Sequence, residues 1–131
     1  MIDLNELRFG NRILQKTGSK IIQVSFGLQH WELLAKGEVS LMYPVVLKPD
    51  VVERCGFVEN KQYPLLPEAR EFTLLLPVQG GNANLLHVYN KNNGECFGRA
   101  TVNGLVASNN FYHLHQLQNL FYLLTGKELA V

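Results

Sequence analysis

The sequence is 131 residues long, 47% of it is hydrophobic, and its formal net charge is +1 at pH 7. A chain of this length can bury a sizeable core, so we expect residues 1–131 to form a single domain. The composition excludes a globally disordered chain, and the near-zero charge favours neither nucleic acid nor an anionic membrane as a partner.

The N-terminus and the cysteines indicate the compartment. Asp3 and Glu6 are acidic where a signal peptide would be basic and then apolar. No apolar run approaches the length of a membrane span. The two cysteines, Cys55 and Cys96, suit a reducing environment as free thiols. We therefore expect a cytoplasmic protein without a membrane partner.

Residues 1–47 predict a small curled antiparallel sheet, an SH3-like half-barrel in size. Alternating apolar and polar residues predict strands over 7–15 and 22–26, joined by a turn at Gly18. The stretch 30–34 fits a third strand, and 38–43 alternates again.

Residues 48–131 predict a short helix, an antiparallel meander and a closing helix. Pro49 suits the first position of a two-turn helix, and Gly56 is placed to end it. A polar loop is expected after Val58. Turns are expected at 79–84 and at two Asn-Gly pairs, 93–94 and 103–104, and about four strands at 72–78, 85–90, 95–102 and 105–107.

The stretch 111–125 has the longest helical periodicity in the chain. Its apolar residues recur at spacings of three and four: Leu114, Leu117, Phe121 and Leu124. A stripe this wide needs a sheet to lie on, and Gly126 can end the helix in a left-handed conformation. The predicted fold class is therefore α+β, with the meander packed by the C-terminal helix.

Three stretches resemble one known family. Residues 3–11, DLNELRFGN, resemble an N-L-R-x-G-N opening, and residues 44–57, PVVLKPDVVERCGF, resemble P-I-x-L-T-x-E-x-L-x-x-x-G-F, with Lys48 where Thr is usual. Residues 115–129, HQLQNLFYLLTGKEL, resemble an H-x-L-Q-N-L-Y-x-x-L-T-G-x-E-L ending. The chain is thus similar to a family of short uncharacterised proteins of Bacteroidetes genomes, their phages and mobile elements. The resemblance implies a bacterial intracellular domain and no particular activity.

Catalytic and metal chemistry find little support in the sequence. Motifs for zinc, phosphate loops and nucleophilic serine are absent, and His113 and His115 would diverge on a helix. We therefore predict no catalytic, cofactor-binding or metal-binding residues. A small hydrolase or ligand-binding enzyme is an alternative that requires His30, His87 and His113 to meet in one pocket.

A basic strand face is the best candidate for nucleic-acid binding. Arg8, Arg12 and Lys16 are expected on one face of the first strand, with Trp31 and Tyr43 as aromatics on which bases could stack. The competing interpretation is a solvated strand face, with Trp31 in the core.

Side-chain amides gather on the final helix at Gln116, Gln118 and Asn119. We favour local hydrogen bonds from them to the loop 103–110, and the alternative is a partner surface.

Taken together, the sequence predicts a non-enzymatic binding or assembly module, associated by resemblance with phages or mobile elements. An unidentified protein is its expected partner, with nucleic acid as the alternative. Exposed strand edges add the hypothesis of a homodimer.

Overall fold

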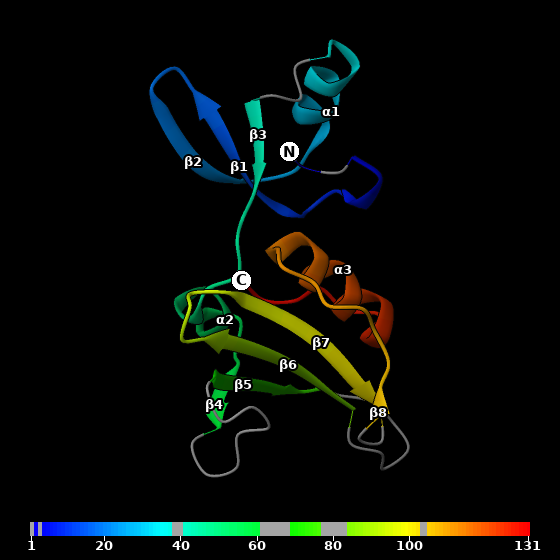
Figure 1. Ribbon diagram of the computed structural model, residues 1–131. Coiled ribbons are helices and arrows are strands. Elements are labelled where there is room, and N and C mark those ends of the chain that lie inside the picture. Colours follow the sequence, from blue (N-terminus) through cyan, green and yellow to red (C-terminus); the bar gives the residue numbers. More distant parts are fainter. Residues whose placement is uncertain (1, 3, 38–40, 61–68, 77–83, 103–104) are drawn as a thin grey trace.

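A computed structural model describes residues 2, 4–37, 41–60, 69–76, 84–102 and 105–131. These residues form the predicted α+β fold, with one three-stranded and one five-stranded sheet. The smaller sheet lies at one end of the molecule and the larger at the other, with the C-terminal helix α3 (Leu114–Thr125) between them (Figure 1).

The elements follow one another in two groups. The first group is η1 (Leu4–Glu6), β1 (Arg12–Thr17), β2 (Lys20–Ser25), α1 (Leu28–Ala35) and β3 (Met42–Pro44). The second group is α2 (Pro49–Arg54), β4 (Val58–Asn60), β5 (Ala69–Leu75), β6 (Asn84–Lys91), β7 (Cys96–Val102), β8 (Leu105–Val106) and α3. The strand orders are β2-β1-β3 and β4-β5-β6-β7-β8, with all these pairs antiparallel.

The first strand begins later than the predicted start at residue 7. Arg8 and Asn11 form a turn instead: the Arg8 N–H donates to Asn11 Oδ1 at 2.7 Å, and the Asn11 N–H donates to the Arg8 carbonyl at 3.0 Å. Gly10, with φ of 95°, allows the chain to bend there. The hairpin with β2 then turns at Gly18, as predicted, with φ of 62°.

The prediction of a strand over 30–34 was wrong, because this stretch belongs to helix α1. His30 is buried and Leu33 and Leu34 are half-buried against the small core, which is helical spacing. The Gly27 N–H, otherwise unsatisfied at the helix start, donates to His30 Nδ1 at 3.0 Å. The apolar residues of this short stretch, Trp31, Leu33 and Leu34, were compatible with both a helical and a strand periodicity.

The meander has five described strands rather than about four. β4 occupies the start of the predicted polar loop and pairs with β5, with Val58 opposite Thr73. β6 and β7 pair along their length, and β8 returns beside β7. The predicted turns at 79–84 and 103–104 fall largely outside the described residues, as do residues 38–40 of the predicted strand 38–43.

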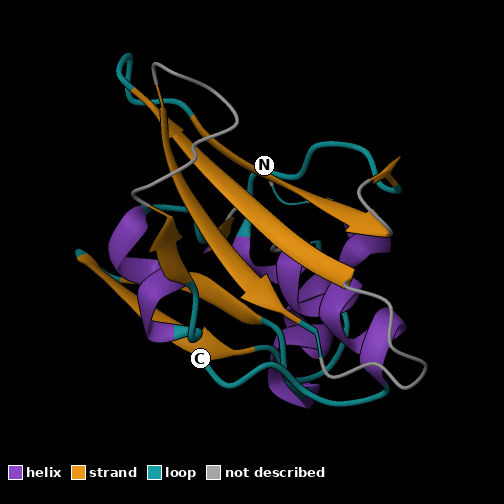
Figure 2. Ribbon diagram, turned by 90° about the horizontal axis from the view of Figure 1, so that it is seen from below, coloured by secondary structure: helices purple, strands orange, loops and turns teal. Residues whose placement is uncertain are grey.

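Two apolar clusters form the core of the described structure. The larger cluster joins the helix-facing side of the five-stranded sheet to α2 and α3, and includes Phe72, Leu86, Val52, Leu117 and Phe121. Figure 2 shows the strands of this sheet in front of the helices. The smaller cluster lies between the three-stranded sheet and α1 and contains Ile2, Ile13, Phe26 and Met42.

Helix α3 starts three residues later than predicted and ends where predicted. His113 is the residue before it, and Gln116 Oε1 accepts the backbone N–H groups of Tyr112 and His113. Gly126 ends the helix with φ of 71°. No helix within the described residues is long and apolar enough to cross a membrane.

Candidate functional site

The three-stranded sheet turns one face away from the small core. Ile13 of β1 is buried in that core, so the alternating neighbours Arg12, Leu14 and Lys16 lie on the opposite face. Residues paired across an antiparallel ladder share a face. We call this the outer face, and it comprises Arg12, Leu14, Lys16, Ile21, Gln23, Ser25 and Tyr43.

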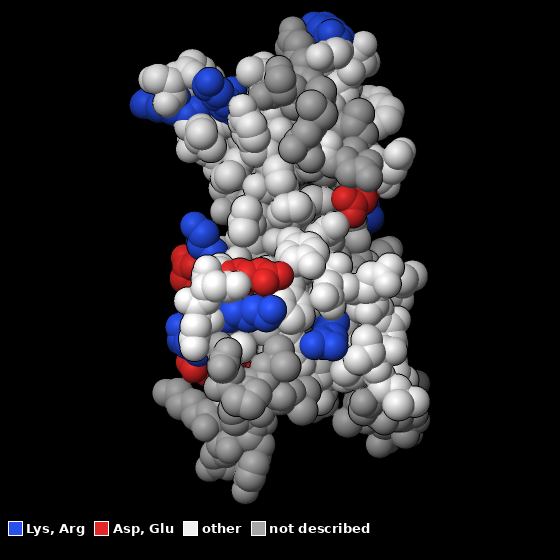
Figure 3. Space-filling view, viewed as in Figure 1, with Lys and Arg blue, Asp and Glu red and all other residues white. Residues whose placement is uncertain are grey.

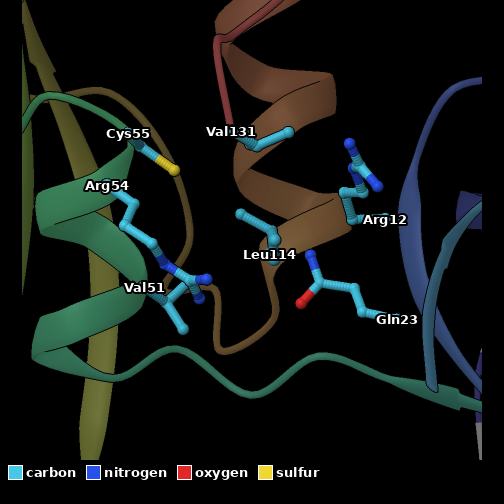
Figure 4. Close-up of a pocket in the computed structure, with 7 residues that line it drawn as sticks. All are labelled: Arg12, Gln23, Val51, Arg54, Cys55, Leu114 and Val131. Atoms are coloured by element: carbon cyan, nitrogen blue, oxygen red, sulfur yellow. The ribbon is translucent and has the colours of Figure 1, made fainter.

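A cleft of about 460 Å³ lies between the outer face and the helical layer of the larger sheet. Its lining residues come from β1, β2, α2, the residue after α2, the start of α3 and the C-terminal residue: Arg12, Gln23, Val51, Arg54, Cys55, Leu114 and Val131. Figure 4 shows the Arg54 side chain reaching into the cleft from α2, with Arg12 and Gln23 on the opposite wall.

Arg12 and Arg54 are the charged side chains in the described lining of this cleft. Its described lining contains no acidic side chain. In the described part of the chain neither Arg12 nor Arg54 has a side-chain hydrogen bond or an ion pair, whereas Arg8 pairs with Glu128 and Arg70 with Glu59. The cleft arginines therefore differ from Arg8 and Arg70, whose charges are offset by carboxylates.

The thiol in the cleft is not activated. Burial raises the pKa of Cys55 to about 11, against a smaller opposing effect of the Arg54 charge. Only the thiolate is a good nucleophile, so this side chain remains a protonated thiol near neutral pH. The cleft has the chemistry to hold an anion through its arginines and the Gln23 amide, and it lacks an activated nucleophile among its described residues.

The structure separates the four residues predicted to bind nucleic acid. Arg12 and Lys16 share the outer face, as predicted, and Tyr43 lies on it. Arg8 precedes the strand, and Trp31 belongs to α1, where it is 54% exposed. Figure 3 shows basic side chains at the tip of the β1–β2 hairpin with no acidic ones beside them.

Arg8 is held by the C-terminal part of the chain. Its guanidinium makes a two-pronged ion pair with the Glu128 carboxylate and donates from Nε to Asn119 Oδ1 at 3.2 Å. It also lies over the Tyr122 ring, 4.5 Å from the centroid. This arginine is therefore part of the internal structure and not of the cleft.

The amides of α3 bond the N-terminal segment, and not the described residues 105–110 of the loop 103–110 to which we expected them to bond. Asn119 Oδ1 accepts from Asn11 Nδ2 at 2.8 Å, and Gln118 Oε1 accepts the Arg12 N–H at 2.7 Å. Gln116 Nε2 donates to Glu6 Oε2 at 2.7 Å. We call this set of hydrogen bonds the polar seam. It joins two of the three stretches that carry the family resemblance.

The three histidines of the enzyme alternative occupy separate environments. His30 Nε2 lies 3.0 Å from Gln15 Oε1 beneath α1, and His87 lies in the larger sheet. His113 precedes α3, and its ring stacks on that of His115 with centroids 5.7 Å apart. The expected divergence of these last two rings was wrong because His113 is not helical. No described pocket contains two of the three histidines.

A buried row of polar side chains crosses the five-stranded sheet on its other face. His87 Nδ1 lies 3.0 Å from Glu71 Oε1, and His87 Nε2 lies 2.9 Å from Thr101 Oγ1. The carboxylate selects the tautomer that donates from Nδ1, so Nε2 accepts from the hydroxyl. The sequence did not predict this row, because its members lie on three different strands.

That row has the order of groups found in acyl-transfer triads, but it is closed. Glu71, His87 and Thr101 are only 2%, 5% and 8% exposed. A substrate must reach the hydroxyl for such a row to act in catalysis. We interpret it as a satisfied polar network in the sheet.

The fold and cleft define an α+β protein with a cleft between its two antiparallel sheets, lined by two arginines that have no described ion-pair partner. Comparison with protein-family models, with curated proteins and with solved structures found no match.

Proposed function

We propose that the protein is a non-enzymatic binding module that holds an anionic group of a partner in the cleft between its sheets. The observation that carries the proposal is that Arg12 and Arg54, which have no described ion-pair partner, line one cleft of about 460 Å³. Arg12 and Arg54 bring two positive charges to the walls of one cleft whose described side chains include no acid, and a bound anion would offset them.

The chemistry of the lining suits a carboxylate or a phosphate. A guanidinium donates two parallel N–H groups to either anion, and the Gln23 amide adds a further donor on the opposite wall. Val51 and Leu114 make part of the wall apolar, which reduces competition from water.

Inorganic phosphate is a suitable probe for this proposal, with binding followed by NMR chemical shifts. We expect shifts around Gln23 and Arg54, and an affinity at least tenfold lower in the double variant R12A/R54A. The matched control is R70A, because Arg70 pairs with Glu59 and does not line the cleft. Equal phosphate binding by R12A/R54A and wild type would overturn the proposal.

Nucleic-acid binding is the second candidate, favoured by the outer face. Residues 12–25 contain three cations, Arg12, Lys16 and Lys20, and no acid, and Tyr43 is 38% exposed beside them. Fluorescence anisotropy with a single-stranded oligonucleotide tests it across salt concentrations. The double charge reversal R12E/K16E is expected to abolish salt-sensitive binding, with K36E on α1 as the control.

We also propose that the protein works in the bacterial cytoplasm. Cys55 and Cys96 are both free and buried, which suits a reducing compartment. The association with phages or mobile elements rests on the family resemblance alone.

A further inference from the structure

Strand β2 is the longest edge strand among the described residues. It forms one edge of its sheet and has six residues, whereas the other described edges, β3, β4 and β8, have three, three and two. Short edge strands are a common protection against unwanted strand pairing. Three of the four edges have that protection, and β2 does not.

The side chains of β2 are exposed on both faces of the strand. Ile21 on the outer face is 58% exposed, and Ile22 on the inner face is 48% exposed. In Figure 1 no described element lies on the side of β2 that faces away from β1. An exposed apolar edge of this length is the surface to which an extended peptide adds.

The hydrogen-bonding direction of the edge follows from the ladder. The Phe26 N–H donates to the Asn11 carbonyl, toward the β1 side. In an antiparallel ladder, the N–H groups of alternate residues point the same way. The N–H groups of Ile22 and Val24 therefore point to β1, and those of Ile21 and Gln23 point outward to the free edge.

We propose that an extended acidic segment of a partner protein adds to β2 as a fourth strand and places a carboxylate in the cleft. The inference rests on the proposed anion-binding role of that cleft. Gln23 connects the two surfaces, because it lies on β2 with an outward N–H and also lines the cleft. An added strand would lie one strand spacing, about 4.8 Å, from it.

The positive charge of the β1–β2 hairpin favours an acidic segment, rather than a second copy of this chain, as the strand that adds to β2. The β1–β2 hairpin carries Lys16 and Lys20 and no acid, so a second copy paired through β2 would add cations and no opposite charge. An acidic strand meets these lysines and the two cleft arginines with opposite charge.

The test uses a capped octapeptide of alternating threonine and valine with one central glutamate, and a matched peptide with glutamine. We expect the glutamate peptide to protect the Ile21 and Gln23 amides from hydrogen exchange. We expect it to bind wild type at least tenfold more tightly than the glutamine peptide. This preference should disappear in R12A/R54A.

The edge itself is tested by a matched pair of variants. Ile21→Pro removes an outward N–H without breaking the ladder to β1, and Ile21→Thr changes the side chain and keeps that N–H. Both variants should keep their circular dichroism. Peptide affinity should fall at least tenfold in I21P only.

Four results would overturn the inference. They are equal peptide binding by I21P and I21T, equal binding of the two peptides, a dimer that I21P dissociates, or an oligonucleotide that protects the same amides more strongly. If I21P and I21T bind the peptide equally but R12A/R54A binds phosphate more weakly than wild type, the added strand is overturned and the anion-binding cleft is not. If R12A/R54A binds phosphate as well as wild type does, the proposed function itself is overturned.

Discussion

Asn119 carries the most connections in the polar seam. Its Oδ1 accepts from Asn11 and Arg8, and its Nδ2 donates to the Glu6 carbonyl. Removing the amide leaves several part-buried groups unsatisfied, which costs about 1–3 kcal/mol. We expect Asn119→Ala to lower the melting temperature by roughly 3–6 °C for each kcal/mol lost.

Differential scanning calorimetry measures this effect, with Asn109→Ala as the control. The Asn109 side chain is exposed and has no described hydrogen bond. An unchanged melting temperature in Asn119→Ala would show that the seam contributes little to stability.

His30 makes the stability of the small core depend on pH. Its Nδ1 accepts the Gly27 N–H, so protonation there removes a hydrogen bond at the start of α1. Burial lowers the pKa of His30 below its ordinary value of 6.5. The unfolded chain therefore binds more protons than the folded chain just below pH 6.5, and stability falls as the pH falls through that range.

Thermal melts at pH 7 and pH 5 check this dependence. Wild type should lose more stability on acidification than His30→Asn, which has no titrating ring. Burial lowers the pKa of His113 as well, and the comparison removes that contribution because His113 is present in both proteins. Equal losses in the two proteins would contradict the role given to His30.

At the scale of elements, Gly98 of β7 and Phe111 join the segment before α3 to the larger sheet. Each donates its backbone N–H to the carbonyl of the other, at 2.7 and 2.9 Å. A Cβ on Gly98 would overlap the Phe111 ring. We expect Gly98→Ala to destabilise the protein by about 1–3 kcal/mol through overpacking.

A double-mutant cycle with Phe111→Leu measures that contact by chemical denaturation. The smaller side chain removes the overlapping ring atoms, so the double variant should be more stable than the sum of the single effects predicts. Strict additivity of the two changes would mean that the overlap is not the source of the cost.

At the scale of the whole molecule, helix α3 belongs to both halves. Its apolar residues Leu117 and Phe121 lie in the larger core, and Gln118 and Asn119 hold the N-terminal segment. If α3 unfolded, the larger core would lose its apolar contacts with the helix, and the N-terminal segment would lose its hydrogen bonds to it. We expect the two sheets to unfold in one cooperative transition.

The single tryptophan makes this testable. Trp31 lies in α1 and reports on the N-terminal half, whereas far-ultraviolet circular dichroism reports on both halves. The two denaturation midpoints should coincide. A fluorescence transition that precedes the circular dichroism transition would show that the smaller sheet unfolds independently.

The sequence by itself determined the elements whose pattern is long or marked by a specific residue. The α3 stripe, Pro49 at the start of α2 and Gly126 after α3 were readable because they act through nearby backbone geometry. The alternation along β6 predicted a strand for the same reason, and the Asn-Gly pairs at 93–94 and 103–104 predicted β7 between them. The short stretch of α1 fitted both periods, and only its packing on the small core decided between them.

The candidate site was decided by the tertiary structure. The Arg8–Asn119 hydrogen bond spans 111 positions, and Arg12 and Arg54 come from different groups of elements. Local periodicity states which side of an element a residue lies on, and it does not state what faces that side. Which arginines find acids, and which line a cleft without them, depends on how the two sheets dock on α3.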